Sequence, residues 1–246
     1  MTLRSPVFVT GVNTGAGKTV FTAALHTWLQ QRGHAVISLK PFSSGNREDA
    51  QLLYRLQQKR VPLRRINPFH FPGELAPLAA ARRAGASITL SDFRKWYQSV
   101  NTGNSFLVLE GAGGLCSPLG EGISALEIIA QVKACTVVVA FNQLGVLNQV
   151  LLTVRALRES KAQSVQVVLM DGEHGDPSSA SNIAILRELM PGIEILQFPW
   201  LGSNPFSNAS LLRAASAVPA WVPARARISV GQRETIQRSR RAVGSR

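Results

Sequence analysis

A glycine-rich loop near the amino terminus constrains the fold of this chain more than any other feature. The apolar residues 7–10 are followed by GVNTGAGKT at positions 11–19, and a helical pattern begins directly afterwards. Between a strand and a helix, glycines let backbone N–H groups turn toward a phosphate chain, and the helix dipole adds to the attraction. Gly11 and Gly17 are separated by five residues where the usual motif has four. The Gly-Lys-Thr ending and the strand–loop–helix context still predict a nucleoside triphosphate site.

Short apolar runs and longer segments of helical spacing alternate along the chain. The predicted strands are residues 7–10, 35–40, 106–109, 135–141, 165–169 and 193–197, and the predicted helices are 18–32, 48–60, 123–132, 147–160 and 178–190. Continuous apolar strands are typical of a sheet buried on both faces. We therefore expect an α/β fold with a mostly parallel sheet, helices on both faces and P-loop NTPase architecture. Ligands of such sheets bind at the carboxyl ends of the strands.

Positive charge is concentrated toward the carboxyl terminus. The 246 residues include 27 Lys and Arg against 14 Asp and Glu, a net charge of +13. Residues 222–246 hold seven of the arginines and one glutamate. Gly, Ser, Gln and Arg dominate residues 230–246, and the few apolar residues there show no helical or strand period. We expect residues 1–222 to form one catalytic domain and residues 223–246 a basic, disordered tail.

Composition also argues against several classes of protein. No run reaches the roughly 18 apolar residues that a membrane helix needs, and the amino terminus lacks the pattern of a signal peptide, so we expect a cytoplasmic protein. Cys116 and Cys135 are too few for a disulfide framework or a four-ligand zinc site.

Charged residues follow the second and third predicted strands. Lys40 lies beside small hydroxyl residues, which suits an anionic reacting group beyond the γ-phosphate. Glu110 ends an apolar strand at a glycine-lined opening, where a carboxylate is a natural Mg²⁺ ligand. Asp49 is a second candidate ligand. Asp171, after the fifth strand, is either part of this site or a loop carboxylate.

The ordered combination of these motifs resembles the dethiobiotin synthetases. The matching segments are residues 11–19, KPFSSG at 40–45 with a following Asp49, EGAGGL at 110–115 with Pro118-Leu119, LGVLN at 144–148, and Asn67-Pro68-Phe69, Pro77 and Pro199-Trp200-Leu201. Together they cover nearly all of residues 6–210. Only the phosphate loop is highly specific by itself, so the resemblance depends on the order of the set.

This resemblance implies a homodimeric carbon–nitrogen ligase of biotin biosynthesis that uses ATP and Mg²⁺. Such an enzyme closes the ureido ring of dethiobiotin from 7,8-diaminononanoate and CO₂. A substrate amine forms a carbamate, the carbamate oxygen attacks the γ-phosphate, and the second amine displaces phosphate from the carbamic–phosphoric anhydride. The products are dethiobiotin, ADP and phosphate.

The resemblance also implies roles for the matching positions. The catalytic residues would be Thr14, Lys18, Lys40 and Ser44, and the Mg²⁺ ligands would be Thr19, Asp49 and Glu110. Nucleotide contacts would come from Gly15, Ala16, Gly17, Lys18, Thr19 and Val20, and on the base side from Met170, Asp171, Pro199, Trp200 and Leu201. The substrate would contact Lys40, Ser44, Gly111, Ala112 and Gly113, and its distal carboxylate would bind Gly145, Val146, Leu147 and Asn148 of the partner subunit.

Two positions on the base side depart from the family. Met170 replaces an asparagine whose amide reads the adenine edge, and Phe206 stands where some members have a ribose-binding acid. Methionine cannot form the paired hydrogen bonds of an amide. We therefore predict less selective nucleotide use with the reaction retained. A degenerate paralogue that binds nucleotide without making dethiobiotin is an alternative.

A further alternative is a P-loop ATPase with a switching or partitioning role whose basic tail binds nucleic acid. Such proteins typically carry an additional lysine early in the phosphate loop. Here that stretch is Asn13-Thr14-Gly15, which argues against this class and against nucleic acid as the partner. An amidotransferase-type synthetase would need a glutaminase domain with a catalytic cysteine, and nothing after residue 222 supplies one.

Overall fold

A six-stranded parallel sheet forms the centre of the protein. The structure is a computed structural model that describes residues 5–101, 103, 105–160, 162 and 164–218, so the expected tail at 223–246 lies outside the described residues. The strands lie in the order β2-β5-β1-β6-β7-β8, and every neighbouring pair is parallel. Their bounds are β1 Val7–Gly11, β2 Val36–Leu39, β5 Phe106–Gly114, β6 Cys135–Phe141, β7 Ser164–Met170 and β8 Glu194–Phe198.

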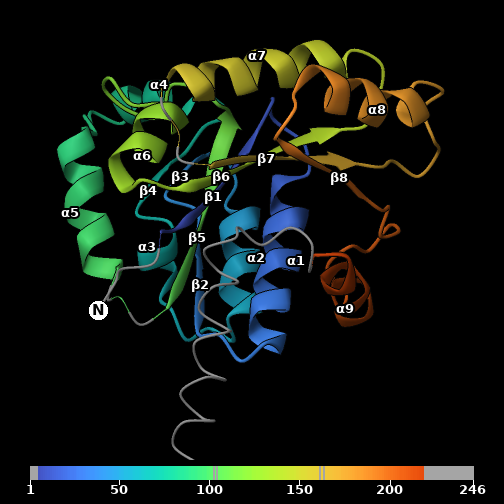
Figure 1. The fold of residues 1–246 in the computed structure, drawn as a ribbon. Helices are drawn as coiled ribbons and strands as arrows, with labels where there is room; N and C mark the ends of the chain where they lie inside the picture. The colour runs from blue at the N-terminus through green and yellow to red at the C-terminus, as the bar shows by residue number, and fades with distance from the viewer. Residues whose placement is uncertain (1–4, 102, 104, 161, 163, 219–246) are drawn as a thin grey trace, which may run out of the picture.

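Helices cover both faces of this sheet, as predicted. Figure 1 shows α7 (Val146–Glu159) and α8 (Ser179–Leu189) above the sheet, and α1 (Lys18–Gln31) and α9 (Asn208–Ala217) below it. Side chains of β1 alternate between two apolar clusters, one on each face of the sheet. Val7 and Val9 pack with α1 and α9, whereas Phe8 packs with the cluster that includes α6 (Ala125–Val132), α7 and α8. The strands are therefore apolar on both faces.

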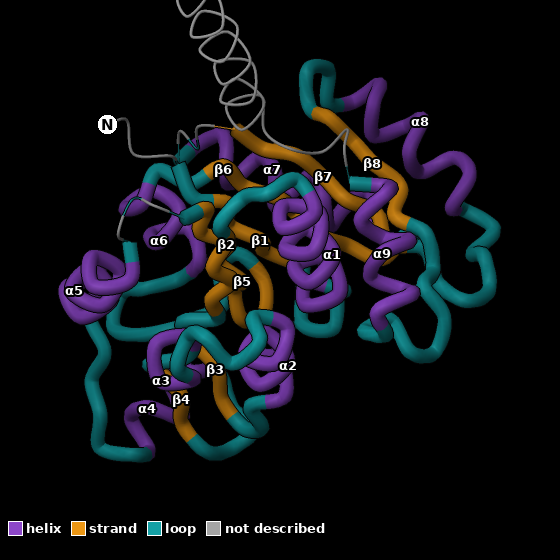
Figure 2. Tube along the Cα trace, turned by 90° about the horizontal axis from the view of Figure 1, so that it is seen from below, coloured by secondary structure: helices purple, strands orange, loops and turns teal. Residues whose placement is uncertain are grey.

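A smaller unit follows β2 and precedes β5. It consists of α2 (Glu48–Leu56), α3 (Leu63–Ile66), α4 (Pro77–Arg83), α5 (Leu90–Val100) and a two-stranded parallel sheet of β3 (Phe42–Ser44) and β4 (Phe69–Phe71). Figure 2 shows β3, β4, α3 and α4 grouped together. The rings of Phe42 and Phe69 stack at 4.9 Å, and Phe93 of α5 stacks on Phe42 at 6.2 Å. These aromatic contacts attach the unit's strands to α5.

The predicted elements are present, and only two of their ends differ by more than two residues. The helix predicted over 48–60 ends at Leu56, because Gln58 and Lys59 adopt left-handed backbone conformations with φ of 53° and 60°. The strand predicted over 106–109 continues to Gly114, since β5 pairs with Gly11 beyond an irregularity in register. No helix among the described residues is long and apolar enough to cross a membrane.

Candidate functional site

The phosphate loop connects β1 to the amino terminus of α1. Gly17 immediately precedes α1 with φ of 91°, a conformation that favours glycine. A Cβ atom on Gly11 would lie 2.9 Å from the Asn13 carbonyl oxygen and 3.0 Å from Lys18 Nζ. Lys18 Nζ donates to that same carbonyl oxygen at 2.8 Å. The loop is thus closely folded, with its lysine beside the free N–H groups of a helix terminus, which is an anion-binding arrangement.

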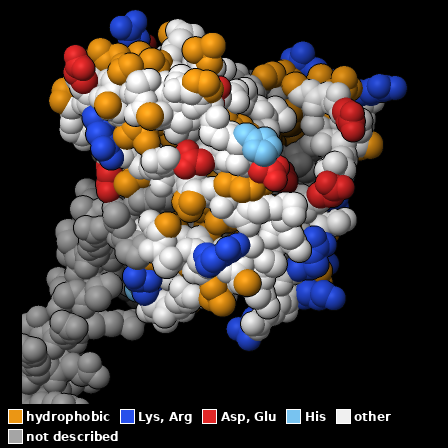
Figure 3. All heavy atoms as spheres, turned by 90° about the vertical axis from the view of Figure 1, so that its right-hand side faces the viewer, with side chains coloured by type: hydrophobic (Ala, Val, Ile, Leu, Met, Phe, Trp, Pro, Cys, Tyr) orange, Lys and Arg blue, Asp and Glu red, His pale blue; other side chains and the backbone are white. Residues whose placement is uncertain are grey.

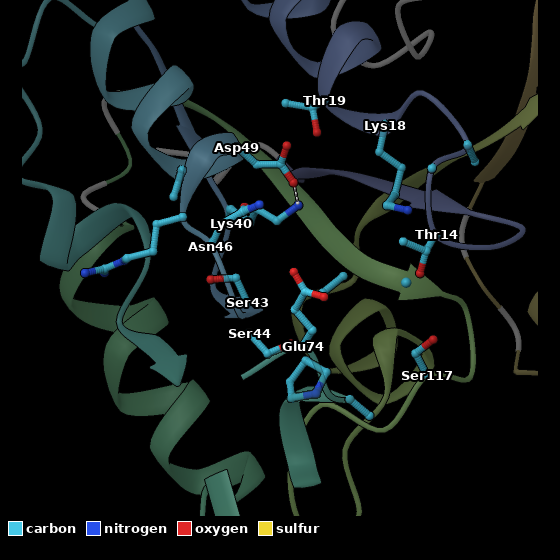
Figure 4. A pocket seen from close by; sticks show the side chains of 18 of the residues that line it. Thr14, Lys18, Thr19, Lys40, Ser43, Ser44, Asn46, Asp49, Glu74 and Ser117 are labelled. Carbon is cyan, nitrogen blue, oxygen red and sulfur yellow. Dashed lines mark hydrogen bonds and ion pairs between the residues drawn. The ribbon is translucent and has the colours of Figure 1, made fainter. Parts of the chain in front are cut away.

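A cavity of about 710 Å³ lies beside this loop. Predicted site residues from three parts of the chain line it (Figure 4): Thr14, Gly15, Ala16, Gly17, Lys18, Thr19, Val20, Lys40, Ser44, Asp49, Ala112 and Gly113. Several other residues that were not predicted as site residues also line it, among them Ser43, Asn46, Arg47, Glu74 and Ser117. The residues expected to handle phosphate and carbamate therefore share one chamber.

Lys40 is held between two carboxylates: Asp49, which also lines the chamber, and Glu110, which is fully buried and is not a lining residue. The Lys40 ammonium lies 2.5 Å from Asp49 Oδ2 and 2.7 Å from Glu110 Oε1. Thr19 Oγ1 donates to the same Glu110 oxygen at 2.7 Å. Burial alone would lower the pKa of Lys40, but attraction to the two carboxylates and their hydrogen bonds raise it. Burial alone would raise the pKa of Asp49, but Lys40 and hydrogen bonds hold it below its ordinary value. Lys40 and Asp49 are therefore both ionised at neutral pH.

Asn67 positions the backbone around Lys40. Its amide donates to the Lys40 carbonyl oxygen at 2.7 Å, and its Oδ1 accepts from Ser43 Oγ at 3.1 Å and from Arg47 Nε at 3.0 Å. Its side chain is buried, so these bonds satisfy a polar group that would be costly to leave unpaired. Asn67 carried part of the sequence resemblance, and its contacts give it a physical role in joining β3, α2 and the end of β2.

Lys18 has a lowered proton affinity. Burial, with a further contribution from the charge of Lys40, lowers its pKa to about 8. A phosphate chain at the loop would provide a negatively charged partner that stabilises the protonated form of Lys18.

Glu110 has an oxygen available for a metal ion. Its Oε1 is engaged by Thr19 and Lys40, whereas Oε2 is buried and has no hydrogen-bond partner. An orphaned buried carboxylate oxygen beside a threonine and an aspartate fits a hard cation such as Mg²⁺. No group of three or more His, Cys, Asp and Glu side chains gathers among the described residues. Mg²⁺ nevertheless fits the set present, because it binds through one or two carboxylates with phosphates and water.

The residues predicted for the base side lie outside this cavity. Met170 is buried, and a Cβ atom on Gly17 would lie 3.0 Å from its Cγ, so it packs beneath the phosphate loop. Asp171 accepts hydrogen bonds from Asn142 at 3.1 Å and Gln197 at 2.8 Å. Trp200 is 44% exposed beside Pro199, whereas Leu201 is buried in the core. Their nucleotide contacts remain predictions.

The substrate residues are divided between two places. Ala112 and Gly113 line the cavity, but the neighbouring Gly111 does not, and a Cβ atom on it would lie 3.1 Å from the ring of Phe8. Gly145, Val146, Leu147 and Asn148 lie at the amino terminus of α7, also outside the cavity lining. A carboxylate site at α7 would thus be separate from the phosphate chamber of the same chain.

Comparison with known proteins identifies the family. The AAA domain family matches residues 5–205. The chain is 31% identical to the ATP-dependent dethiobiotin synthetase BioD of Idiomarina loihiensis over 206 residues, which are 79% of this chain and 92% of the relative. It is 33% identical to the enzyme of the same name from Anaeromyxobacter dehalogenans over 199 residues, 79% of this chain and 89% of the relative.

The chain belongs to the dethiobiotin synthetase family. The family predicted from the ordered motifs is thereby confirmed, as is the prediction of an ATP-using ligase that forms carbon–nitrogen bonds.

The fold of this dethiobiotin synthetase family member is similar to that of a cell division protein. The structure of the MinC:MinD cell division complex of Aquifex aeolicus matches with a TM-score of 0.57 at 15% identity, covering 87% of this chain and 93% of that chain. That likeness shows the fold alone and does not favour a partitioning role. On the face shown in Figure 3, Lys and Arg side chains are interspersed with Asp and Glu, and no continuous basic surface appears among the residues described there.

Proposed function

We propose that this protein is an ATP-dependent dethiobiotin synthase that closes the ureido ring of dethiobiotin from 7,8-diaminononanoate and CO₂. The observation that carries the proposal is the position of Lys40. This buried ammonium, fixed by Asp49 and Glu110, lies in the same chamber as Lys18 and Thr19 of the phosphate loop. A carbamate needs a cationic partner, and its oxygen must lie close to the γ-phosphate that it attacks.

In the proposed reaction, the residues of this chain act mainly by position and charge. Thr14, Lys40 and Ser44 bind and orient the carbamate, and Lys18 stabilises charge on the transferred phosphoryl group. Carbamate formation joins an amine nitrogen to CO₂ and releases a proton. After phosphoryl transfer, the second ammonium loses a proton and its nitrogen attacks the carbonyl carbon. The carbon–oxygen bond to phosphate breaks, phosphate leaves with the electron pair, and the new nitrogen releases a second proton to give the neutral ureido ring.

Thr19, Asp49 and Glu110 would hold Mg²⁺. The support for this assignment is the orphaned Oε2 of Glu110 and the hydrogen bond that already joins Glu110 to Thr19. When bound, Mg²⁺ supplies positive charge to the β- and γ-phosphate oxygens.

The nucleotide's base would lie near Met170, Asp171 and Trp200, beyond the phosphate loop. Met170 offers apolar contact with no paired donor and acceptor, so we propose reduced discrimination among nucleoside triphosphates. Turnover with ATP, GTP, CTP and UTP would then differ by about tenfold or less. A strict preference for ATP would contradict this part of the proposal.

The substrate's distal carboxylate would bind at the amino terminus of α7 in a partner subunit. Two observations support a homodimer of this kind: residues 145–148 lie outside the chain's own cavity, and Leu144 beside them is 82% exposed. The proposal includes a cytoplasmic location for the enzyme.

The test is an assay of the purified full-length protein with diaminononanoate, bicarbonate, Mg²⁺ and each nucleotide, with dethiobiotin detected by mass. We expect dethiobiotin with at least ATP. In Lys40→Ala, turnover should fall about 100-fold or more, while the nucleotide Kd changes less than about threefold. Absence of product with every nucleotide would overturn the proposed function.

A further inference from the structure

Glu74 is a carboxylate of the chamber that the proposed reaction does not yet use. It lies between β4 and α4 and lines the cavity beside Leu75 and Pro77. Figure 4 shows its side chain pointing into the cavity, with Lys40 and Asp49 on the opposite side. It belongs to none of the segments that carried the family resemblance.

The backbone around Glu74 is fixed against the end of β3. Ser44 Oγ donates to the Leu75 carbonyl oxygen at 2.5 Å, and Leu75 N donates to the Gly73 carbonyl oxygen at 2.9 Å. Gly45 adopts φ of 71°, and a Cβ atom on it would lie 3.2 Å from Glu74 Cγ. The stem of Glu74 thus packs against a glycine in the turn that follows Ser44. Contacts on both sides hold it at the cavity wall.

The charges around the cavity leave Glu74 without a counterion. Asp49 is paired with Lys40, and Arg47 donates to the side chain and carbonyl of Asn67. Among the described residues, no hydrogen bond or ion pair engages the Glu74 carboxylate. A free carboxylate in a chamber for triphosphate and carbamate repels both anions. The carboxylate of Glu74 is therefore complementary only to a positively charged group among the bound molecules.

The proposed diamine supplies such a cation. Alkyl amines resemble lysine, whose ordinary pKa is about 10.4, so at least one amine of the free substrate is an ammonium at neutral pH. Once one amine has become the carbamate, the other remains positively charged until it loses its proton. The two nitrogens are on adjacent carbons. An anionic partner for the ammonium and a cationic partner for the carbamate would therefore orient the substrate.

We propose that Glu74 binds the ammonium group of the diamine that does not carry the carbamate. The carbamate then faces Lys40, and the ammonium faces Glu74 on the opposite wall. This inference rests on the proposed function and adds a binding residue to it. Glu74 selects a diamine over a monoamine and presents the second nitrogen to the carbon that it will attack.

The test compares Glu74→Gln and Glu74→Asp with wild type and with Glu188→Gln, which removes the same charge from an exposed position on α8. For Glu74→Gln we expect the KM for diaminononanoate to rise about tenfold or more, the scale of a lost hydrogen bond between charged groups. The KM for ATP and the Mg²⁺ dependence should stay within twofold. Glu74→Asp should fall between Glu74→Gln and wild type.

Direct binding separates a role in recognition from a role in folding. Calorimetry with a non-hydrolysable ATP analogue present should show weaker binding of diaminononanoate to Glu74→Gln. 8-Aminononanoate has a single amine, and with bicarbonate present that amine becomes the carbamate that faces Lys40, so this compound should bind Glu74→Gln and wild type alike. If wild type makes dethiobiotin but the KM and affinity of Glu74→Gln for the diamine stay within twofold of the Glu188→Gln values, this inference alone would be overturned. A wild-type protein that makes no dethiobiotin would overturn the proposed function and this inference together.

Discussion

The ammonium of Lys40 faces carboxylates in two different environments. Glu110 is fully buried, whereas the Asp49 side chain is 47% exposed. Burial of a charge is costly unless the charge is paired. The attraction between Lys40 and Glu110 therefore offsets the free-energy cost of removing both charged groups from water. The same pairing keeps Lys40 protonated where an anionic carbamate would bind.

Removal of one member of this pair should therefore destabilise the protein more than removal of both. Lys40→Met leaves Glu110 buried without its ammonium and should lower the free energy of unfolding by about 3–5 kcal/mol. Lys40→Met with Glu110→Gln should recover most of that loss. Urea unfolding of the three proteins measures it. A double variant no more stable than Lys40→Met would contradict the pairing argument.

The lowered pKa of Lys18 predicts proton uptake on nucleotide binding. With a pKa of about 8, Lys18 of the free protein is mostly neutral at pH 9, and a bound triphosphate raises its pKa. We expect uptake close to one proton at pH 9 and little at pH 6.5. Calorimetry in buffers of different ionisation enthalpy measures this uptake.

Lys18→Arg provides the control, because arginine stays protonated at both pH values and should show no uptake. The pKa also affects stability. Between pH 8 and 10.5 the unfolded chain binds more protons than the folded one at this site, so the destabilising contribution of Lys18 diminishes as the pH rises through that window. Equal proton uptake by wild type and Lys18→Arg at pH 9 would contradict the assignment.

At the scale of elements, the phosphate loop depends on β7 as well as on β1 and α1. Gly17 has φ of 91°, and Met170 at the end of β7 lies where a side chain on Gly17 would point. The phosphate loop thus packs against the end of β7, which lies two strands away from β1 in the sheet.

Gly17→Ala should weaken nucleotide binding about tenfold, because a left-handed conformation costs alanine about 1–2 kcal/mol and Met170 must move. Met170→Ala in the same chain should relieve the contact but not the backbone cost, so binding should recover only in part. Gly175→Ala is the control, since nothing lies within 4 Å of that added Cβ. Unchanged nucleotide affinity in Gly17→Ala would contradict this view of the loop.

Periodicity and strand-end logic predicted the six strands of the main sheet and brought Lys18, Lys40 and Asp49 to one chamber. They missed the strands of the unit between β2 and β5, because β3 and β4 are three residues each and depend on aromatic contacts such as Phe42 with Phe69. Glu74 was missed for the same reason. Its place depends on a Ser44–Leu75 hydrogen bond across 31 residues, which no local pattern reveals.

At the scale of the whole molecule, the proposed carboxylate site requires a second subunit. We expect a homodimer by light scattering. Leu144→Asp, at the exposed residue before α7, should weaken the dimer and raise the KM for diaminononanoate with little effect on ATP binding. Leu189→Asp, at an exposed position on α8, is the matched control. A monomeric wild-type enzyme with full activity would contradict the shared site.

The central claim is that a carbamate oxygen attacks the γ-phosphate beside Lys40. Rapid mixing of enzyme, ATP, Mg²⁺ and diaminononanoate with ¹⁸O-labelled CO₂ tests it directly, with the released phosphate analysed by mass. The proposed sequence breaks the bond between carbon and the bridging oxygen, so one labelled oxygen should appear in phosphate for each dethiobiotin formed. Dethiobiotin accompanied by unlabelled phosphate would contradict the account.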